Sequence, residues 1–207
     1  VVHLAGEPVL AGRWNAARKH AIHDSRVLLT RRIAQAIRAA ERPPSVFISA
    51  SAVGYYGDRS DEILTEASPG GDDFLAEVCR DWEGEALAAE SEETRVAIPR
   101  IGIVLGTEGG ALARMLPIFR VGAGGRLGTG RQFMSWIHLD DLLEAFAFAI
   151  DNERLRGPFN AVGPTPVDNG SFTRALGSAL GRPTLLPVPG FALKAVFGGA
   201  ASVLLGG

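Results

Sequence analysis

The sequence predicts an α/β fold, in which a parallel sheet is covered by helices on both faces. Strand and helix patterns alternate along the chain in the order strand, helix, strand, helix, strand. The apolar runs are continuous, which is typical of strands that are buried on both faces of a parallel sheet. The length of 207 residues suits one domain of this type, or one domain with a small appendage.

The first third of the chain contains two predicted strands and a long helical region. The opening residues, 1–4, read as a buried strand that runs into a turn at Gly6. Apolar residues then recur at three- and four-residue steps over 13–40, which predicts a long helix or a helix pair. Two prolines end this segment, and the apolar run 46–48 predicts the next buried strand.

The middle of the chain predicts another helix and another strand. Residues 74–89 read as a helix with most of its acidic side chains facing solvent. The apolar side of this helix is expected to carry Phe74, Val78, Trp82 and Leu87. Residues 95–105 form the next predicted strand, closed by Gly106. Pro99 removes one ladder donor from that strand, which favours an edge position or a bulge.

The region after this strand is rich in glycine and less regular. A short helix is predicted at 111–119 within the irregular segment 109–135. Residues 136–139 read as a short strand or turn. Asp140 or Asp141 is then expected to cap a helix that ends at residue 150.

The C-terminal part contains one more strand and two helical patterns. The strand is predicted at 159–162, and Ser171 is expected to cap an amphipathic helix over 172–180. The apolar stretch 191–207 contains Lys194 and is shorter than the roughly 20 apolar residues that a membrane span needs. We therefore predict a buried helix and its continuation there, and no membrane partner.

Composition excludes several classes of protein. Hydrophobic residues make up 46% and charged residues 21% of the chain, which excludes a disordered protein. The single cysteine, Cys79, excludes a disulfide framework and a cysteine zinc site, and it suits the cytoplasm. A net charge of −2 gives no electrostatic basis for nucleic-acid binding.

The small residues of the chain gather where the predicted strands end. Ala5 and Gly6 follow the first strand, 49–57 follows the second, and 102–106 ends the third. Ligands of open parallel sheets bind at the carboxyl ends of the strands. The convergence of three such ends predicts a nucleotide or cofactor site.

An ordered series of motifs resembles one protein family. The matching segments are 4–7, 13–14, 25–26, 51–57, 82–83, 100–105, 122–125, 128–132, 136–140 and 157–160. Together they resemble the atypical short-chain dehydrogenase/reductases of the epimerase family, which are similar to nucleoside-diphosphate-sugar epimerases and some of which carry a cell-division-inhibitor label. The series spans nearly all 207 residues and is far more specific than any one of its motifs.

This resemblance implies a Rossmann-type doubly wound parallel sheet that lacks its first strands, with a smaller C-terminal substrate-side region. Residues 1–109 would be the later part of an NADP-binding domain. Residues 110–207 would form a mixed region of substrate-side loops, a returning strand and C-terminal helices. The family's glycine-rich phosphate turn would precede Val1, so we expect a chain truncated at both ends. The glycines of 122–128 follow a predicted helix instead of a strand, and they are therefore not assigned to this turn.

The resemblance also suggests the residues that contact NADP. They are Leu4, Ala5, Gly6, Arg26, Arg100 and Val104. The first three end the strand that passes beside the ribose and adenine in the family; the alternative is a simple tight turn. Arg26 would contact the cofactor through its planar guanidinium, or it is one of many solvent-facing arginines. Val104 and Arg100 mark the strand end expected near the nicotinamide, and strand packing is the alternative for Val104.

The expected catalytic residues are Ser51, Tyr55 and Tyr56. Related enzymes pair such a serine with a Tyr-x-x-x-Lys, in which the phenol transfers a proton and the lysine lowers its pKa. The helix that begins at Phe74 has neither a phenol nor an ammonium group at these positions. Arg59 could assist a nearby tyrosine electrostatically but could not donate a proton near neutral pH. Ser51 with either tyrosine is therefore a substitute acid–base pair, or these residues only line a pocket.

No metal site is predicted. His138, Asp140 and Asp141 precede a helix, and this pattern more often means an N-cap with a packed histidine than a set of metal ligands. The other histidines are His3, expected in the core, and His20 and His23, expected at the surface.

The sequence thus predicts an NADP(H)-binding oxidoreductase or epimerase-like protein. It would act by hydride transfer on a small-molecule substrate, of which a nucleotide sugar is one candidate. The alternative is a non-catalytic module that binds or senses NADP(H). The sequence leaves the oligomeric state open.

Overall fold

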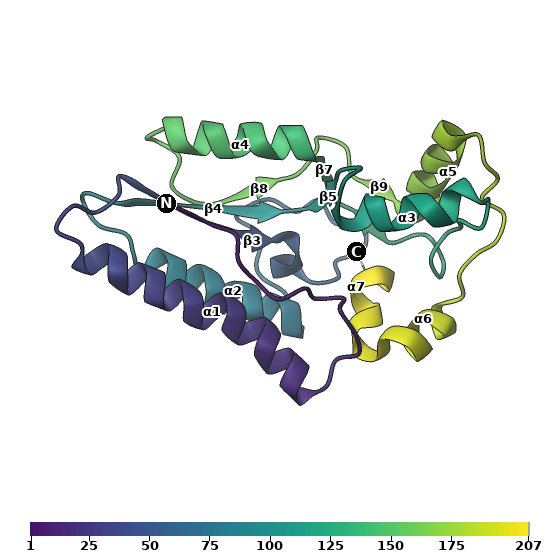
Figure 1. Ribbon diagram of the computed structural model, residues 1–207, viewed down its shortest axis with the longest axis horizontal. Coiled ribbons are helices and arrows are strands. Elements are labelled where there is room, and N and C mark those ends of the chain that lie inside the picture. The colour runs from purple at the N-terminus through teal and green to yellow at the C-terminus, as the bar shows by residue number, and fades with distance from the viewer. Residues whose placement is uncertain (207) are drawn as a thin grey trace.

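The computed structural model describes residues 1–206. A five-stranded sheet forms its centre (Figure 1). The strands run in the order β1 (Val2–His3), β2 (Val46–Ser49), β4 (Arg95–Ile101) and β3 (Ser51–Ala52), and β8 (Gly157–Ala161) also pairs with β4. Every pair in this sheet is parallel, so the predicted α/β fold with a parallel sheet is confirmed.

Helices cover both faces of the sheet. In Figure 1, α1 (Ala16–Ala39) and α2 (Phe74–Leu87) lie side by side below it, and α4 (Leu139–Asp151) lies above it. Phe47 of β2 packs with the residues of α1 and α2, whereas the next residue, Ile48, packs with α4. Both side chains are fully buried, as the continuous apolar run predicts.

The two long helices begin at side-chain caps. Asn15 accepts a hydrogen bond from the backbone N–H of Arg18 at 2.8 Å, so α1 is one helix that begins after this cap and not at residue 13. Asp73 caps α2 in the same way, through the N–H of Ala76 at 2.9 Å.

The prediction for the two sides of α2 is wrong at two positions. Leu87, which we placed on the apolar side, is exposed, and Glu83 is buried at 6% exposure. The last turn of α2 extends past the core, whereas Glu83 lies inside the core and forms an ion pair with Arg100.

The position predicted for Pro99 is also wrong. β4 lies in the interior of the sheet, between β8 and the pair β2 and β3, and is therefore not an edge strand. The register is the same on both sides of the proline, because Ile48 faces Ala97 and Ser51 faces Arg100. No residue is inserted, so the strand contains no bulge. Pro99 lacks the N–H donor, and the pairing of β4 is therefore interrupted between β2 and β3.

The predicted strand 95–105 divides at Gly102 into β4 and β5 (Ile103–Leu105). A Cβ at Gly102 would lie 2.4 Å from the carbonyl oxygen of Ser135, so only glycine fits this close approach. β5 then pairs in parallel with β7 (Trp136–His138), which starts a second, smaller sheet.

The remaining elements lie outside the two parallel sheets. They are α3 (Gly110–Arg120), the antiparallel pair β6 (Phe133–Met134) and β9 (Val167–Asp168), α5 (Asn169–Leu180), α6 (Gly190–Phe197), α7 (Ser202–Leu205) and the 3-10 turns at Val53–Tyr56 and Gly198–Ala201. In Figure 1, α6 and α7 lie below α3 and α5, on the side of the sheet that carries α1.

Two of the predicted helix caps are wrong, because each helix begins earlier than the sequence pattern indicates. α4 is capped by His138, whose side chain accepts from the N–H of Asp140 at 3.2 Å. α5 is capped by Asp168, which accepts from the N–H of Ser171 at 2.6 Å. In both cases an acceptor precedes the residue that we predicted, and it satisfies the first free donors of the helix.

The segment predicted as a buried helix at 191–207 consists of shorter pieces. Ala200 and Ala201 are buried, but Phe191 and Val196 are exposed, so only one side of this segment faces the core. Residue 207 lies outside the described residues. Within 1–206, no helix is both long and apolar enough to cross a membrane.

Candidate functional site

The candidate site lies where the strands of the central sheet end. Ser51 and Arg100 face each other across β3 and β4, so parallel pairing places them side by side. The 3-10 turn directly after β3 carries Tyr55 and Tyr56 to the same edge. The sheet thereby gathers the three predicted catalytic residues and one of the predicted cofactor residues.

A buried ion pair occupies the centre of this cluster. The guanidinium of Arg100 donates to both carboxylate oxygens of Glu83, from Nε at 2.9 Å and from Nη2 at 2.8 Å. The hydroxyl of Ser51 donates to the same carboxylate at 2.6 Å. Arg100 is 3% exposed, so the pair is removed from water and must satisfy its charges internally.

The two tyrosines contact the other side of Arg100. Its Nη1 donates to the hydroxyl oxygen of Tyr56 at 3.0 Å, and that hydroxyl donates to Oδ1 of Asn160 at 2.7 Å. The ring of Tyr55 lies against the guanidinium, with Cζ of Arg100 3.5 Å from the ring centroid. Burial acts to lower the pKa of Arg100, but the bonds to Glu83 and Tyr56 outweigh it and raise that pKa.

A surface loop closes this network. Glu66 accepts a hydrogen bond from the backbone N–H of Asn160 at 2.8 Å, and this bond lowers the pKa of Glu66. The carbonyl of Glu66 also lies within 3.5 Å of Nη1 of Arg100. The loop therefore covers the part of the network that contains Tyr56 and Asn160.

The hydroxyl groups of the two tyrosines differ in the hydrogen bonds that they make. Tyr56 is buried and its hydroxyl is used twice, once as acceptor and once as donor. Tyr55 is half-buried, and its hydroxyl makes no hydrogen bond to another described residue. Of the two phenols, Tyr55 is the one available to a ligand.

The predicted cofactor residues at the end of β1 are open to solvent. Leu4, Ala5 and Gly6 are exposed, and Ala5 and Gly6 are small enough to leave the backbone accessible. At the end of the adjacent β2, the hydroxyl of Ser49 is buried and has no hydrogen-bond partner among residues 1–206. An accessible backbone beside an unpaired hydroxyl fits a dinucleotide lying across these strand ends.

Arg26 lies next to this strand end but uses its donors within the chain. It donates to the carbonyl oxygens of Ile22 and Glu7 at 3.0 and 3.1 Å, and a Cβ at Gly6 would lie 2.8 Å from its Cζ. Its guanidinium also lies 5.4 Å from the ring of Trp82. Burial lowers the pKa of Arg26. Arg26 thus fixes the turn at Gly6, and its direct contact to a cofactor stays a prediction.

Val104 lies apart from the buried network. It belongs to β5, where it faces Ile137 of β7, and it packs against the apolar cluster around that strand. Its predicted place beside a nicotinamide is not tested by these contacts.

Two members of the network, Glu83 and Asn160, are not among the residues that the sequence predicts for the site. Both lie in segments of the motif series, 82–83 and 157–160, and this was the available signal. The acidic pattern of α2 indicates a solvated face, and only the contact with Arg100, which lies 17 residues further along the chain, shows why Glu83 is buried.

The histidines form no metal site in the described part of the chain. His138 acts as the cap of α4, and residues 1–206 contain no group of three His, Cys, Asp or Glu side chains that could hold a metal ion. His3 is buried, with Nε2 3.0 Å from the hydroxyl of Thr30, which confirms its place in the core; burial lowers its pKa.

His20 is exposed, as predicted, but the prediction for His23 is wrong. His23 is half-buried between Asp24 and Asp81, at 3.1 and 3.0 Å, and it links α1 to α2. The carboxylate of Asp81 belongs to the neighbouring helix α2, and the pattern of α1 alone could not indicate this contact.

Comparison with known proteins identifies close relatives. The model of the NAD dependent epimerase/dehydratase family matches residues 1–163. The chloroplastic SDR39U1 homolog of Arabidopsis thaliana, an epimerase family protein, is 49% identical over all of this chain and 60% of its own length. An epimerase family protein of Mycobacterium leprae is 46% identical over 96% of this chain and 64% of its own. The chain therefore spans less than two thirds of these relatives.

Solved structures agree with this result. The crystal structure of human epimerase family protein SDR39U1 with NADPH matches with a TM-score of 0.93 and 37% identity, over 99% of this chain and 70% of that one. The nucleoside-diphosphate sugar epimerase of Corynebacterium glutamicum matches with a TM-score of 0.75 and 41% identity, over 99% of this chain and 45% of that one. The Rossmann-type fold that the motifs imply is confirmed by the first of these matches.

Proposed function

The chain belongs to the NAD dependent epimerase/dehydratase family, and on this premise we propose that it binds NADPH and catalyses hydride transfer to or from a small-molecule substrate. The observation that supports this most is the set of strand ends at one sheet edge, where exposed Leu4, Ala5 and Gly6 lie near the polar cluster of β3 and β4. The human structure that matches this chain at a TM-score of 0.93 contains NADPH. A nucleotide sugar is one candidate substrate class, since a related epimerase of that class shares the fold.

In this proposal each residue at the sheet edge has a distinct task. The backbone of residues 4–6 holds the dinucleotide, which supplies the hydride chemistry when it is bound. Tyr55 donates its phenolic hydrogen to the substrate oxygen, because its hydroxyl is free of partners among the described residues. Arg100 lies against its ring and orients it. Ser51 and Tyr56 hold Glu83 and Arg100 in place from either side.

A non-catalytic NADP(H)-binding or sensing module is the second candidate, and a specific observation favours it. The hydroxyl hydrogens of Ser51 and Tyr56 are already donated, to Glu83 and Asn160, and both residues are 3% exposed. The helix that begins at Phe74 also has no Tyr-x-x-x-Lys. In this second function the polar cluster only stabilises the fold around the bound dinucleotide.

Turnover of NADPH across a panel of carbonyl compounds separates the two candidates. The enzyme proposal predicts oxidation of NADPH with at least one compound, and a loss of about 100-fold or more in kcat for Tyr55→Phe while the Kd for NADPH stays unchanged. A Tyr55→Phe variant that turns over like the unchanged protein would contradict the role of Tyr55. Binding of NADPH without oxidation of any carbonyl compound would favour the sensing module.

We also propose that the protein is located in the cytoplasm. The single cysteine favours the cytoplasm. The Arabidopsis relative is described as chloroplastic.

A further inference from the structure

His3 is a buried titratable residue to which the proposed function gives no task. It is the last residue of β1, and it directly precedes the exposed strand end 4–6 to which we assign the dinucleotide. His3 itself is only 5% exposed. Its backbone carbonyl accepts a hydrogen bond from the N–H of Ala50 at 3.0 Å, which joins β1 to the end of β2. A displacement of His3 therefore moves the strand end with it.

The hydrogen bonds around His3 determine which ring nitrogen carries the hydrogen of the neutral imidazole. Nε2 of His3 lies 3.0 Å from Oγ1 of Thr30. The hydroxyl of Thr30 has one hydrogen, which it donates to the carbonyl of Arg26 at 2.6 Å. Thr30 can then only accept from the imidazole, so Nε2 carries the hydrogen. Nδ1 of His3 makes no hydrogen bond to another residue of 1–206.

Two contacts connect His3 to Arg26. The first is the hydroxyl of Thr30, which bonds both residues. The second is the ring of Trp82, which lies edge-on to the ring of His3 at 6.3 Å between centroids and 5.4 Å from Cζ of Arg26. Arg26 packs closely on the turn at Gly6, where a Cβ would lie 2.8 Å from Cζ. His3 is thus connected to the turn that follows the strand end.

The elements on two sides of His3 offer no anion to a protonated ring within the described residues. β2 contributes the buried hydroxyl of Ser49, which is paired with His3 in the register of the two strands. α1 contributes the hydroxyl of Thr30 and the guanidinium of Arg26. A protonated His3 would therefore be a second cation on the ring of Trp82, and two cations that are removed from water repel each other strongly.

α2 contributes two buried titratable groups on this side of the sheet, and neither is available to an imidazolium. Cys79 remains a thiol near neutral pH, because burial raises its pKa to about 11. The carboxylate of Glu83 already binds Arg100 and Ser51. Burial therefore lowers the pKa of His3 without an opposing charge, and the ring is neutral at pH 7.5.

We propose that His3 is a positioning residue of the cofactor site, and that it holds the strand end 4–6 in its binding shape only as a neutral imidazole. The neutral ring donates to Thr30 and packs on Trp82, and Arg26 then stays on the turn. Protonation places two cations on one indole ring, so that Arg26 leaves the turn and the dinucleotide loses backbone contacts. The inference rests on the proposed function, because it requires a dinucleotide at these strand ends.

NMR titration of the histidine rings, with and without NADP⁺, tests this inference. The oxidised dinucleotide is used because reduced nicotinamides decompose in acid. If NADP⁺ binds only the form with a neutral His3, reciprocity requires that saturation with NADP⁺ lowers the pKa of His3 further. The His3→Gln variant identifies the signal of His3 among the four histidines, and the exposed ring of His20 is the internal control. A pKa of His3 that stays the same, or that the phosphates of the ligand raise, would overturn the inference.

The affinities of three variants give a second readout. His3→Gln keeps an N–H donor for Thr30 but does not titrate, so its Kd for NADP⁺ at pH 7.5 should stay within about threefold of that of the unchanged protein. His3→Leu removes the donor and should weaken NADP⁺ binding at least about tenfold. Equal affinities of the His3→Gln and His3→Leu variants would contradict the positioning role.

The pH dependence of these affinities isolates the charge of the ring. From pH 7.5 to one pH unit below the measured pKa of His3, the affinity of the unchanged protein should fall about tenfold more than that of His3→Gln. His20→Gln, the matched control, should behave like the unchanged protein. The phosphates of the ligand titrate alike in all three, so a difference comes from the protein. The same pH dependence in the unchanged protein and in His3→Gln would overturn the inference.

The inference and the proposed function fail in different ways. Binding of NADP⁺ that leaves the titration of His3 unaffected would overturn only the role of His3. Absence of NADP⁺ binding at pH 7.5 would overturn the proposed function, and the role of His3 with it.

Discussion

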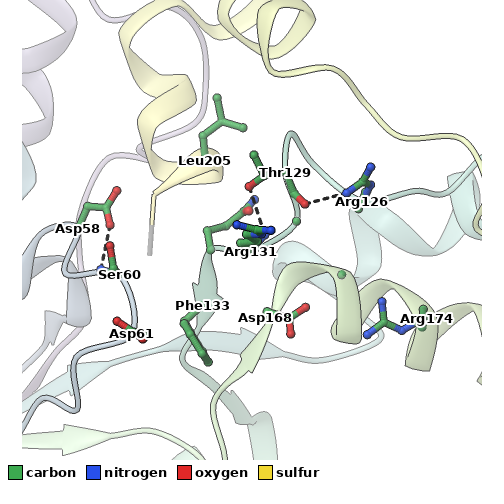
Figure 2. A pocket seen from close by; sticks show the side chains of 13 residues that line it. Asp58, Ser60, Asp61, Arg126, Thr129, Arg131, Phe133, Asp168, Arg174 and Leu205 are labelled. Atoms are coloured by element: carbon green, nitrogen blue, oxygen red, sulfur yellow. Dashed lines mark hydrogen bonds between the residues drawn. The ribbon is translucent and has the colours of Figure 1, made fainter.

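Two polar regions of this molecule differ in how their charges are satisfied. In the network of Ser51, Glu83, Arg100, Tyr56 and Asn160, every charged or hydroxyl group has a partner, and the members from Ser51 to Tyr56 are nearly inaccessible to water. A cavity of about 800 Å³ between 58–61 and 126–133 is open to solvent (Figure 2), and the arginines and aspartates that line it form no ion pair with one another in the described part of the chain. The comparison indicates that the first region stabilises the fold and that the second is available to a ligand.

The largest effect on stability should come from Glu83→Ala. It leaves Arg100 buried without its anionic partner and Ser51 without its acceptor, and breaking a buried pair in this way costs about 3–5 kcal/mol. Unfolding in urea measures this loss as a change in the free energy of unfolding.

Glu77→Ala is the control for that measurement. Glu77 lies on the same helix but is exposed, and its loss should change the unfolding free energy by about 0.5 kcal/mol or less. If both variants lost equally little stability, the buried network would not be the stabilising region that we describe.

The two tyrosines provide the next test of the comparison. Tyr56→Phe removes a hydroxyl that accepts from Arg100 and donates to Asn160, which should cost about 1–3 kcal/mol of unfolding free energy. Tyr55→Phe removes a hydroxyl without a partner in the described part of the chain, and its effect should stay within about 0.5 kcal/mol. Thermal unfolding of the two variants checks this. A larger loss of stability for Tyr55→Phe than for Tyr56→Phe would show that Tyr55 is the structural phenol and that Tyr56 is the available one.

A smaller effect is expected at His23, which belongs to neither region and links α1 to α2. Burial acts to lower its pKa, but the hydrogen bonds and charges of Asp81 and Asp24 outweigh it and raise that pKa in the folded state. The raised pKa means that the protonated ring stabilises the fold; this contribution is complete below the unfolded value of about 6.5 and is lost as pH rises through the folded value. Its size should be that of an exposed ion pair, below about 1 kcal/mol.

Unfolding of the His23→Gln variant at two pH values measures this contribution. The difference in unfolding free energy from the unchanged protein should be larger near pH 5.5 than near pH 8.5. Asp81→Asn removes the partner in α2 and should flatten the same dependence. A difference that does not change with pH would show that the ring is not held in its charged form.

The smallest effect on stability is predicted for the cavity. Arg131→Gln and Asp61→Asn should each change the unfolding free energy by about 0.5 kcal/mol or less, because neither side chain has a partner to lose in the described structure. Chemical unfolding of both variants checks this. A loss as large as that of Tyr56→Phe would mean that these charges stabilise the fold and are not free for a ligand.

The sequence predicts the parts of this fold that depend on local patterns. The continuous apolar run 46–48 indicates a strand buried on both faces, and the spacing over 13–40 indicates the long helix. Both patterns reflect burial against a layer, which needs no knowledge of the partner residue. The clustering of strand ends follows from parallel pairing alone.

The features that depend on distant partners could not be predicted in this way. Pro99 indicates an edge strand, but β4 accommodates it in the interior by interrupting its pairing with β2 and β3. In the sequence Glu83 has the pattern of a solvent-exposed residue, and only its ion pair with Arg100 explains why it is buried. The cavity likewise depends on loops that are more than 60 residues apart, 58–61 and 126–133, and no spacing in the sequence brings their charges to one place.

Fluorescence titration with NADPH, and then with NADH, tests the central proposal most directly. Trp82 lies beside Arg26 at the end of β1, and energy transfer from the tryptophans should report the bound nicotinamide. We predict saturable binding with NADPH preferred, weakened at least about tenfold by Ala5→Asp at the strand end and unchanged by Ala17→Asp on the exposed first turn of α1. Absence of binding to either dinucleotide, or equal binding by the two variants, would contradict a cofactor site at these strand ends.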